Sequence, residues 1–142
     1  MSRVQEILRD RKLFSVQAAQ TVAEVARRMA DLKIGAILVL ERDELRGVFS
    51  ERDLMTRVVL EGREPARTPV AEVMTTNIAT IHEEATLEAA MESMQTRGCR
   101  HLPVMRDGRV VGFLSMRDLM NYELARKSEE LSQMRAYISG AS

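Results

Sequence analysis

The sequence has few of the features that mark several common classes of protein. It contains one cysteine, Cys99, which excludes an intrachain disulfide framework. It has no tryptophan and only 4% aromatic residues, so few side chains could stack against single-stranded nucleic acid. The 21 basic and 21 acidic residues cancel, so no net field would attract nucleic acid or an anionic membrane. We therefore expect neither as a partner.

Long apolar runs are also absent from the sequence. No run approaches the roughly 20 residues that a membrane-spanning helix requires. Residues 1–6 lack the apolar core of a signal peptide, which favours a cytoplasmic location. A hydrophobic content of 45% in 142 residues is enough for one continuous core or two small cores packed together. The composition therefore indicates a globular protein.

The most informative feature that is present is an internal repeat. Residues 21–59 align without a gap on residues 86–124, so that Thr21 matches Thr86 at a constant shift of 65 positions. The densest match is the pattern Gly-x-x-Ser-x-Arg-Asp-Leu-Met, which begins at Gly47 and again at Gly112. Two copies of so long a period predict a pseudo-symmetric pair rather than a solenoid. We therefore expect function where the two halves meet.

Each half predicts the same order of elements: strand, helix, strand, strand, helix. Apolar residues at helical spacing predict helices behind Thr21, over residues 22–32, and behind Thr86. Short apolar runs predict strands at 14–16, 36–40 and 45–49, and at 79–81, 102–105 and 110–114. The last pair surrounds Asp107-Gly108, a strong tight-turn signal. A second helix begins after Ser50 and after Ser115, and short helical segments at 4–8 and 70–74 precede the halves.

Proline and glycine mark the boundary between the halves, within residues 61–69. We expect a first repeat over residues 1–64, a linker over 65–69, a second repeat over 70–127, and a C-terminal helix and tail over 128–142. Helical character continues over residues 122–138, with an intermittent apolar stripe at Leu124, Leu131, Met134 and Ile138. This stripe fits a helix lying on its own domain and a dimer contact equally well.

The repeated motif places a serine and an aspartate at the start of a helix. Ser50 and Asp53 form one pair, and Ser115 and Asp118 form the other. The first helical turn offers free backbone N–H groups to a phosphate, and an ionised aspartate can accept two hydrogen bonds from the vicinal diol of a ribose. Glycine three residues earlier would let such a ligand approach closely. The same spacing is also a variant capping box, and both interpretations can hold at once.

These patterns resemble a known family. The markers are Val70-Ala-Glu-Val-Met74, Arg100-His-Leu-Pro-Val104 and the two copies of Gly-hydrophobic-hydrophobic-Ser-x-Arg-Asp. The chain is similar to a tandem pair of cystathionine-β-synthase (CBS) domains, the Bateman module, of the stand-alone type. The resemblance implies an α/β (α+β) fold in which two pseudo-symmetric β-α-β-β-α repeats pack sheet to sheet, followed by a C-terminal helix. No catalytic domain accompanies the pair, so we expect no enzyme activity.

The resemblance further implies that clefts between the repeats bind adenosine-containing nucleotides such as AMP, ATP or NAD. In the family the aspartate contacts the ribose hydroxyls, which implies this role for Asp53 and Asp118. The residues implied for one site are Val48, Ser50, Asp53, Ala79, Cys99 and Arg100. Those implied for the other are Phe113, Ser115, Asp118, Phe14, Ile34 and Gly35, with His101 near the phosphates.

The two implied sites are not equivalent. The second repeat has Arg100 and His101 where the first has Gly35 and Ala36, so positive charge is concentrated in one half. We therefore expect asymmetric phosphate binding. Arg52 and Arg117 either contact phosphates or are solvated surface arginines. Cys99 and His101, with His82 as the only other histidine, provide too few ligands for a metal site.

Two functional hypotheses follow. The first is a nucleotide-sensing regulatory module that acts on an unidentified partner protein. The second is a ligand-free interaction scaffold. In both, the resemblance implies a homodimer formed by the helices after the Ser-x-Arg-Asp motifs. The apolar residues expected to be exposed there are Leu54, Met55, Val58, Leu119 and Met120.

Overall fold

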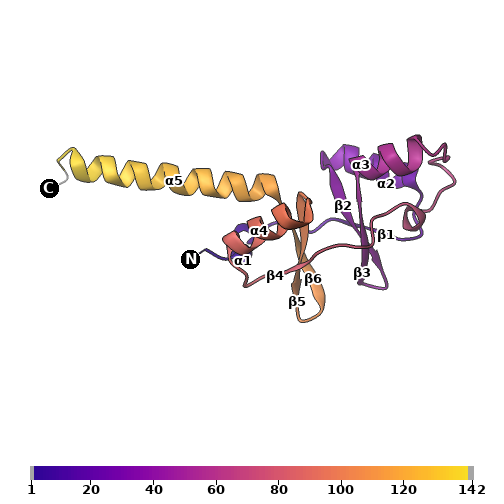
Figure 1. Cartoon of the computed structure of the whole chain (residues 1–142), viewed down its shortest axis with the longest axis horizontal. Helices are drawn as coiled ribbons and strands as arrows, with labels where there is room; N and C mark the ends of the chain where they lie inside the picture. Colours follow the sequence, from indigo (N-terminus) through magenta and orange to yellow (C-terminus); the bar gives the residue numbers. More distant parts are fainter. Residues whose placement is uncertain (1, 141–142) are drawn as a thin grey trace.

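The structure is a computed structural model that describes residues 2–140, with two small sheets side by side and one long helix that extends away from them (Figure 1). Each sheet has three strands and carries helices at one end. The predicted α/β architecture of two similar halves with a C-terminal helix is confirmed. Strand β3 of the first half contacts strand β6 of the second, so the two sheets meet along these strands.

The first half contains a sheet in the order β1-β2-β3. Its elements are β1 (Ser15–Gln17), α2 (Val22–Leu32), β2 (Ala36–Glu41), β3 (Glu44–Ser50), α3 (Glu51–Asp53) and the π-helical turn η1 (Leu54–Val59). Strand β1 runs parallel to β2, and β2 pairs antiparallel with β3. The expected helix over residues 22–32 is confirmed. The expected helix after Ser50 forms, but it changes from α to π geometry at Leu54.

The second half repeats this arrangement in the order β4-β5-β6. Its elements are β4 (Ile81–His82), α4 (Leu87–Arg97), β5 (His101–Arg106), β6 (Arg109–Ser115) and α5 (Met116–Ile138). Each hairpin has an irregularity at the equivalent position, between Val39 and Leu40 and between Val104 and Met105. The internal repeat of the sequence is therefore repeated in the structure down to the register of the strands.

Local sequence explains where the elements begin and turn. The Thr21 and Thr86 side chains each accept a hydrogen bond from the backbone N–H three residues later and so cap α2 and α4. The β5–β6 hairpin turns at Asp107 and Gly108, both with positive φ, as the Asp-Gly dipeptide predicts. The β2–β3 hairpin instead uses Arg42 and Asp43 with positive φ, so its turn is tighter than the four charged residues suggested.

The short segments that precede the two halves exchange places. Helix α1 (Val4–Leu8) packs against β6 and α5 of the second half, where the Val4 N–H donates to the Ala85 carbonyl at 2.9 Å. The 3-10 turn η2 (Val70–Glu72) packs against the first half, where the Val70 N–H donates to the Gln20 carbonyl at 2.8 Å. Each half is thus completed by a segment that precedes the other half.

Two separate cores result from this exchange. The first core contains Val70 and Val73 beside residues of β1, α2, β2 and β3, and the second contains Val4 and Ile7 beside residues of α4, β5 and β6. Val58 and Leu119 are fully buried in these cores, which corrects the expectation that they are exposed. The helical faces after the motifs expose Met55 and Met120 as expected.

The motif glycines have a structural role that differs from the expected one. A Cβ at Gly47 would lie 2.7 Å from the Met74 sulfur and 2.7 Å from the Thr75 carbonyl oxygen. A Cβ at Gly112 would lie 2.5 Å from Cδ1 of Leu8. The exchanged segments therefore occupy the space that glycine leaves on each strand. The close approach we expected of a ligand is made by the protein's own chain.

Candidate functional site

The two Ser-x-x-Asp motifs begin where β3 and β6 end, on the strands through which the halves touch. Both motifs form reciprocal capping boxes. The Asp53 N–H donates to the Ser50 hydroxyl at 3.2 Å, and the Ser50 N–H donates to Asp53 Oδ2 at 3.0 Å. The matching distances for Asp118 and Ser115 are 3.0 and 2.9 Å. The capping interpretation is therefore confirmed at both motifs, and one oxygen of each carboxylate is committed to it.

The other oxygen of Asp53 points to the exchanged segment. The Thr75 hydroxyl donates to Asp53 Oδ1 at 3.0 Å, and the Arg57 Nε lies 3.6 Å from the same oxygen. The Asp53 side chain is 9% exposed. A buried carboxylate is stable only when its oxygens are partnered, and here a hydroxyl, a backbone N–H and a guanidinium partner it. Asp53 is thus a rigid acceptor at the boundary between the halves.

Asp118 has a different partner in the equivalent position. Its Oδ1 accepts a hydrogen bond from Arg11, whose side chain is about half exposed, while the Asp118 side chain is 15% exposed. Burial opposes ionisation, but the Ser115 N–H, the Arg11 guanidinium and the Ser115 hydroxyl outweigh it and lower the pKa of Asp118 below its usual value. Asp118 is therefore ionised at neutral pH and paired with a solvent-accessible cation.

His101 lies beside the second motif. It pairs with Ser115 across the β5–β6 ladder, and its ring lies 5.1 Å from the Phe113 ring, centroid to centroid. Burial is the largest cause that lowers the pKa of His101; Asp118 and Glu51 act to raise it and Arg100 to lower it. The imidazole is consequently neutral at neutral pH and can both donate and accept a hydrogen bond. Its surroundings include charges from both halves, since Glu51 belongs to the first.

The residues implied for the first site come from both halves. Val48 lies on β3 and makes two backbone hydrogen bonds of 2.9 Å with Thr75. Ala79 and Cys99 pack against the second core, and Arg100 is exposed. The Arg100 carbonyl accepts a hydrogen bond from the Met116 N–H at 2.8 Å, which ties the loop before β5 to its own motif. Contact of Ala79, Cys99 and Arg100 with Asp53 stays a prediction.

The residues implied for the second site divide in the same way. The structure brings Phe113, Ser115, Asp118 and His101 together at one end of the β5–β6 hairpin. Phe14 and Ile34 pack against the first core, and Phe14 lies under the Arg28 guanidinium at 5.9 Å from the ring centroid. The Gly35 carbonyl accepts from the Glu51 N–H at 2.9 Å. Completion of the second site by Phe14, Ile34 and Gly35 stays a prediction.

Four residues at the motifs were not among those the sequence singled out. They are Arg11, Thr75 and Arg57, which contact the aspartates, and Glu51, whose carboxylate lies next to Gly35. The equivalent of Glu51 is Met116, so the halves differ in charge here too. Thr75 directly follows the Val70–Met74 marker, which could have pointed to it. Arg52 and Arg117 are exposed at the helix surface.

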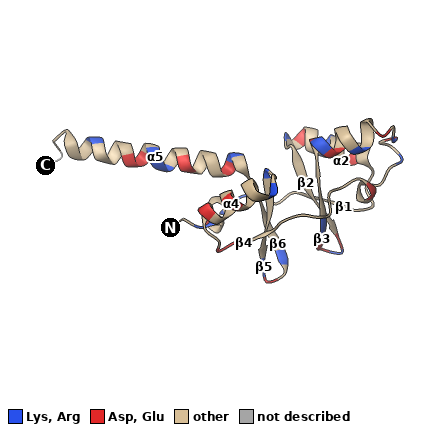
Figure 2. Cartoon of the chain, in the orientation of Figure 1, with Lys and Arg blue, Asp and Glu red and all other residues tan. Residues whose placement is uncertain are grey.

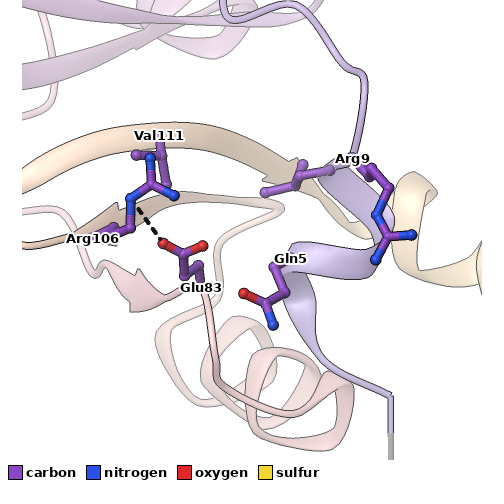
Figure 3. Close-up of a pocket in the computed structure, with 6 residues that line it drawn as sticks. Gln5, Arg9, Glu83, Arg106 and Val111 are labelled. Carbon is purple, nitrogen blue, oxygen red and sulfur yellow. Dashed lines mark ion pairs between the residues drawn. The ribbon is translucent and has the colours of Figure 1, made fainter.

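Two surface hollows lie away from the Ser-x-x-Asp motifs. One, of about 420 Å³, is lined by Gln5, Leu8, Arg9, Glu83, Arg106 and Val111. Arg106 Nε lies 3.2 Å from Glu83 Oε2 across it, as the dashed line in Figure 3 shows. The second, of about 400 Å³, lies between the hairpin ends and includes Arg46, Thr76 and Met105. Both are open and mixed in polarity, and neither is lined by a motif serine or aspartate.

Two further properties concern other kinds of site. Within the part of the chain that the structure describes, no three His, Cys, Asp or Glu side chains gather as metal ligands. No helix between residues 2 and 140 has the length and apolar character needed to cross a membrane.

Comparison with known proteins identifies the repeat. The family model of the CBS domain matches the chain twice, over residues 4–60 and 70–125. The chain belongs to the CBS domain family. Both matches include a Ser-x-x-Asp motif, and each begins at one of the exchanged segments. The predicted resemblance to a tandem CBS pair is therefore confirmed.

Individual CBS proteins are similar over most of the chain. A mitochondrial CBS domain-containing protein of Arabidopsis thaliana is 30% identical over 125 residues, which are 84% of this chain. The chain spans 61% of that relative's length. The structure of a protein with CBS domains from Burkholderia ambifaria matches with a TM-score of 0.83 at 31% identity, over 87% of this chain and 95% of that one.

The solved structures similar to this chain include a complex with AMP. A CBS domain protein from Pyrobaculum aerophilum, solved in complex with AMP, matches with a TM-score of 0.76 at 28% identity. The match covers 82% of this chain and 89% of that one. A CBS pair similar to this chain in sequence and in fold thus binds an adenosine nucleotide.

Proposed function

We propose that this CBS pair is a regulatory module that binds an adenosine-containing nucleotide between its two repeats. The observation that carries the proposal is the repeated Ser-x-x-Asp cap at the meeting strands, in a family whose relative from Pyrobaculum aerophilum was solved with AMP. In each of two sites the motif aspartate, Asp53 or Asp118, would accept hydrogen bonds from both hydroxyls of a ribose. The exposed helix start would face the phosphate. The module has no catalytic role in this proposal and transmits ligand binding to a partner protein.

Each aspartate already has a protein partner at the oxygen that a ribose would use. Thr75 donates to Asp53, and Arg11 donates to Asp118. A neutral diol can replace the single hydroxyl of Thr75, or it can share the carboxylate with it. At Asp118 the nucleotide would displace Arg11, whose freed guanidinium would be available to the phosphate. Displacement of Arg11 would therefore signal that a nucleotide is bound at the second motif.

Charge favours a nucleotide with a short phosphate chain. His101 is neutral and lies within the electrostatic reach of Glu51, so phosphates near it would meet an acid as well as Arg100. A phosphate site beside these groups would therefore suit AMP, or the AMP half of NAD, better than ATP. We therefore still expect phosphate binding to differ between the two sites, and Glu51 is an additional reason.

Differential scanning fluorimetry tests the proposal. A ligand that binds only the folded state raises the melting temperature, so AMP at a hundredfold excess over Kd adds about 2.7 kcal/mol to the stability. Asp53→Asn and Asp118→Asn keep the size of the side chain and should each reduce the shift. Thr86→Ala is the matched control, because it removes the cap of α4 without touching a motif. The proposal is wrong if the Asn variants shift as the wild type does.

We further propose that the module is a homodimer. The support is the exposed apolar face on the helical segments after the motifs, where Met55 is 54% exposed, Val59 64%, Leu60 73% and Met120 53%. A regulated partner could bind the same face. Equilibrium sedimentation at micromolar concentration should give twice the chain mass, and a monomer would contradict the proposed dimer without affecting nucleotide binding.

A further inference from the structure

The C-terminal half of α5 is a helix with no support from its own chain. Helix α5 is tied to the body near its start, where Tyr122 and Arg126 are hydrogen-bonded with Ser2. Every residue from 127 to 140 is exposed, and the helix extends clear of both sheets (Figure 1). A solvated helix of about a dozen residues is marginal in water, because most helical stability in proteins comes from packing of an apolar face. The extension therefore needs a partner surface.

Five of the six large apolar side chains that α5 exposes follow a regular pattern, and Tyr137, at 83% exposure, is the exception. They are spaced alternately by four or three residues, and Lys127 occupies the one remaining position of the series. The exposed side chains are Met120 at 53%, Leu124 at 65%, Leu131 at 55%, Met134 at 60% and Ile138 at 74%. Such a spacing repeats every 3.5 residues and defines the a and d positions of a coiled coil, with Leu124, Leu131 and Ile138 at a. We call this series the α5 seam.

The charges beside the α5 seam indicate which molecule would cover it. Figure 2 shows acidic and basic residues interspersed along the helix. In the heptad frame Glu130 is at position g and Arg135 is at the following e position. Parallel helices bring g of one chain next to the following e of the other, so two copies would form two Glu130–Arg135 pairs. Antiparallel helices match g with g and e with e, which gives Glu130 no opposite charge.

We infer that two copies of this chain associate through their α5 seams as a short parallel coiled coil. Lys127 at position d costs stability in such a seam and restricts register, in the way a single buried polar residue does. Its aliphatic stem can cover the seam while its ammonium reaches water. The seam spans only about 27 Å, fewer than the three to four heptads of a self-sufficient coiled coil, so it adds to other contacts between the copies. The inference does not depend on nucleotide binding.

Disulfide trapping tests the arrangement on the full chain. In a Cys99→Ser background, Leu124→Cys and Ile138→Cys each place a thiol at position a, where parallel copies bring identical residues together. Ala136→Cys is the matched control, because position f lies on the opposite side of the helix. We expect each seam variant alone to form disulfide-linked dimers at least tenfold faster than the control.

Other arrangements give other patterns. An antiparallel pair brings position a of one helix opposite position d of the other, so it would cross-link only in a mixture of the Met120→Cys and Ile138→Cys proteins. This result would overturn the parallel coiled coil. Equal, slow cross-linking of all variants would mean that a different surface or molecule covers the seam. Lys127→Leu gives a second measurement that loss of folding cannot mimic. It should tighten the dimer at least tenfold in sedimentation, and an unchanged Kd would contradict the inference.

Discussion

The Arg11 guanidinium donates a hydrogen bond to the Asp118 carboxylate, although 107 positions separate the two residues. The contact exists because α1 crosses to the second half before the chain returns to start β1. Thr75 makes the equivalent contact with Asp53 after η2 has crossed to the first half. Each exchanged segment therefore ends at the aspartate of the half that it completes. This couples the connection between the halves to the proposed nucleotide site.

The Arg11–Asp118 pair should make stability depend on pH in the acid range. A carboxyl whose pKa is lower in the folded state stabilises it above the unfolded pKa, and this contribution is lost as the pH falls through the folded pKa. Asp118→Asn should therefore cost up to about 1 kcal/mol at pH 7, because the pair is partly exposed. The difference from wild type should begin to shrink at about pH 4, near the ordinary aspartate pKa, and should be lost only as the pH falls through the lower pKa of folded Asp118. Urea unfolding at several pH values measures this.

His101 should produce a second pH dependence. Its pKa is lowered in the folded state, mainly by burial, so the unfolded chain binds more protons as the pH falls below the ordinary histidine pKa near 6.5. Stability should decrease in the wild type as the pH falls from about 6.5 towards the lower pKa of folded His101, and this decrease should be smaller in His101→Gln. His82 is exposed, so His82→Gln is the control and should keep the wild-type dependence. If the decrease in stability at lower pH is lost in His82→Gln but kept in His101→Gln, the effect comes from His82 and the prediction is wrong.

The exchanged segments predict unequal costs for alanine at the motif glycines. Gly47→Ala would place a Cβ against the Thr75 backbone, which cannot move without breaking its pairing with Val48. Gly112→Ala would meet only the end of the flexible Leu8 side chain. We expect Gly47→Ala to cost about 1–3 kcal/mol and Gly112→Ala to cost less, as measured by chemical denaturation. Equal costs would mean that the crossing segments do not constrain the strands.

Different residue types end α2 and α4, although the backbone conformation at the two ends is the same. Both α2 and α4 end at a residue with left-handed backbone, Lys33 with φ 58° and Gly98 with φ 66°. Only glycine adopts this conformation without strain. Lys33→Gly should therefore raise the melting temperature, by the equivalent of up to about 1 kcal/mol, and Gly98→Ala should lower it by a similar amount. A destabilised Lys33→Gly protein would contradict this explanation.

The sequence predicted the fold well because its signals were local and were present twice. The cap and the apolar spacing that specify the helix over residues 22–32 lie within one short stretch of sequence. The Asp107-Gly108 turn needs only two residues. The exchange of α1 and η2 was not predicted, because the two segments resemble each other and nothing local says which core each one joins. The clash at Gly47 follows from that long-range choice, so it was also invisible in the sequence.

The sequence placed the motif residues at helix starts but did not reveal which other side chains contact them. Ser50, Asp53, Ser115 and Asp118 were found because motif and helix start coincide. Arg11 was not found, because it lies in the charged run Arg9-Asp10-Arg11-Lys12, which in sequence looks like ordinary solvated surface. Thr75 and Glu51 were missed for a related reason: their neighbours across the halves are set by tertiary packing.

The sequence also did not predict correctly which apolar residues after the motifs are exposed. Val58 and Met55 are equally apolar in sequence, yet Val58 is in the first core and Met55 is exposed. The change to π geometry at Leu54 alters the angular spacing of the following side chains, so an ideal α-helical pattern misplaces them. Spacing alone therefore predicted an interface without identifying its residues.

Calorimetric titration with AMP measures whether the two motif aspartates hold an adenosine nucleotide. We predict that the wild type and Thr86→Ala bind AMP equally. Asp53→Asn and Asp118→Asn should each lose an AMP site or weaken it by roughly tenfold to a hundredfold, the value of hydrogen bonds to a charged group. Wild-type binding by both Asn variants, or no binding of AMP by a folded wild type, would contradict the proposed function.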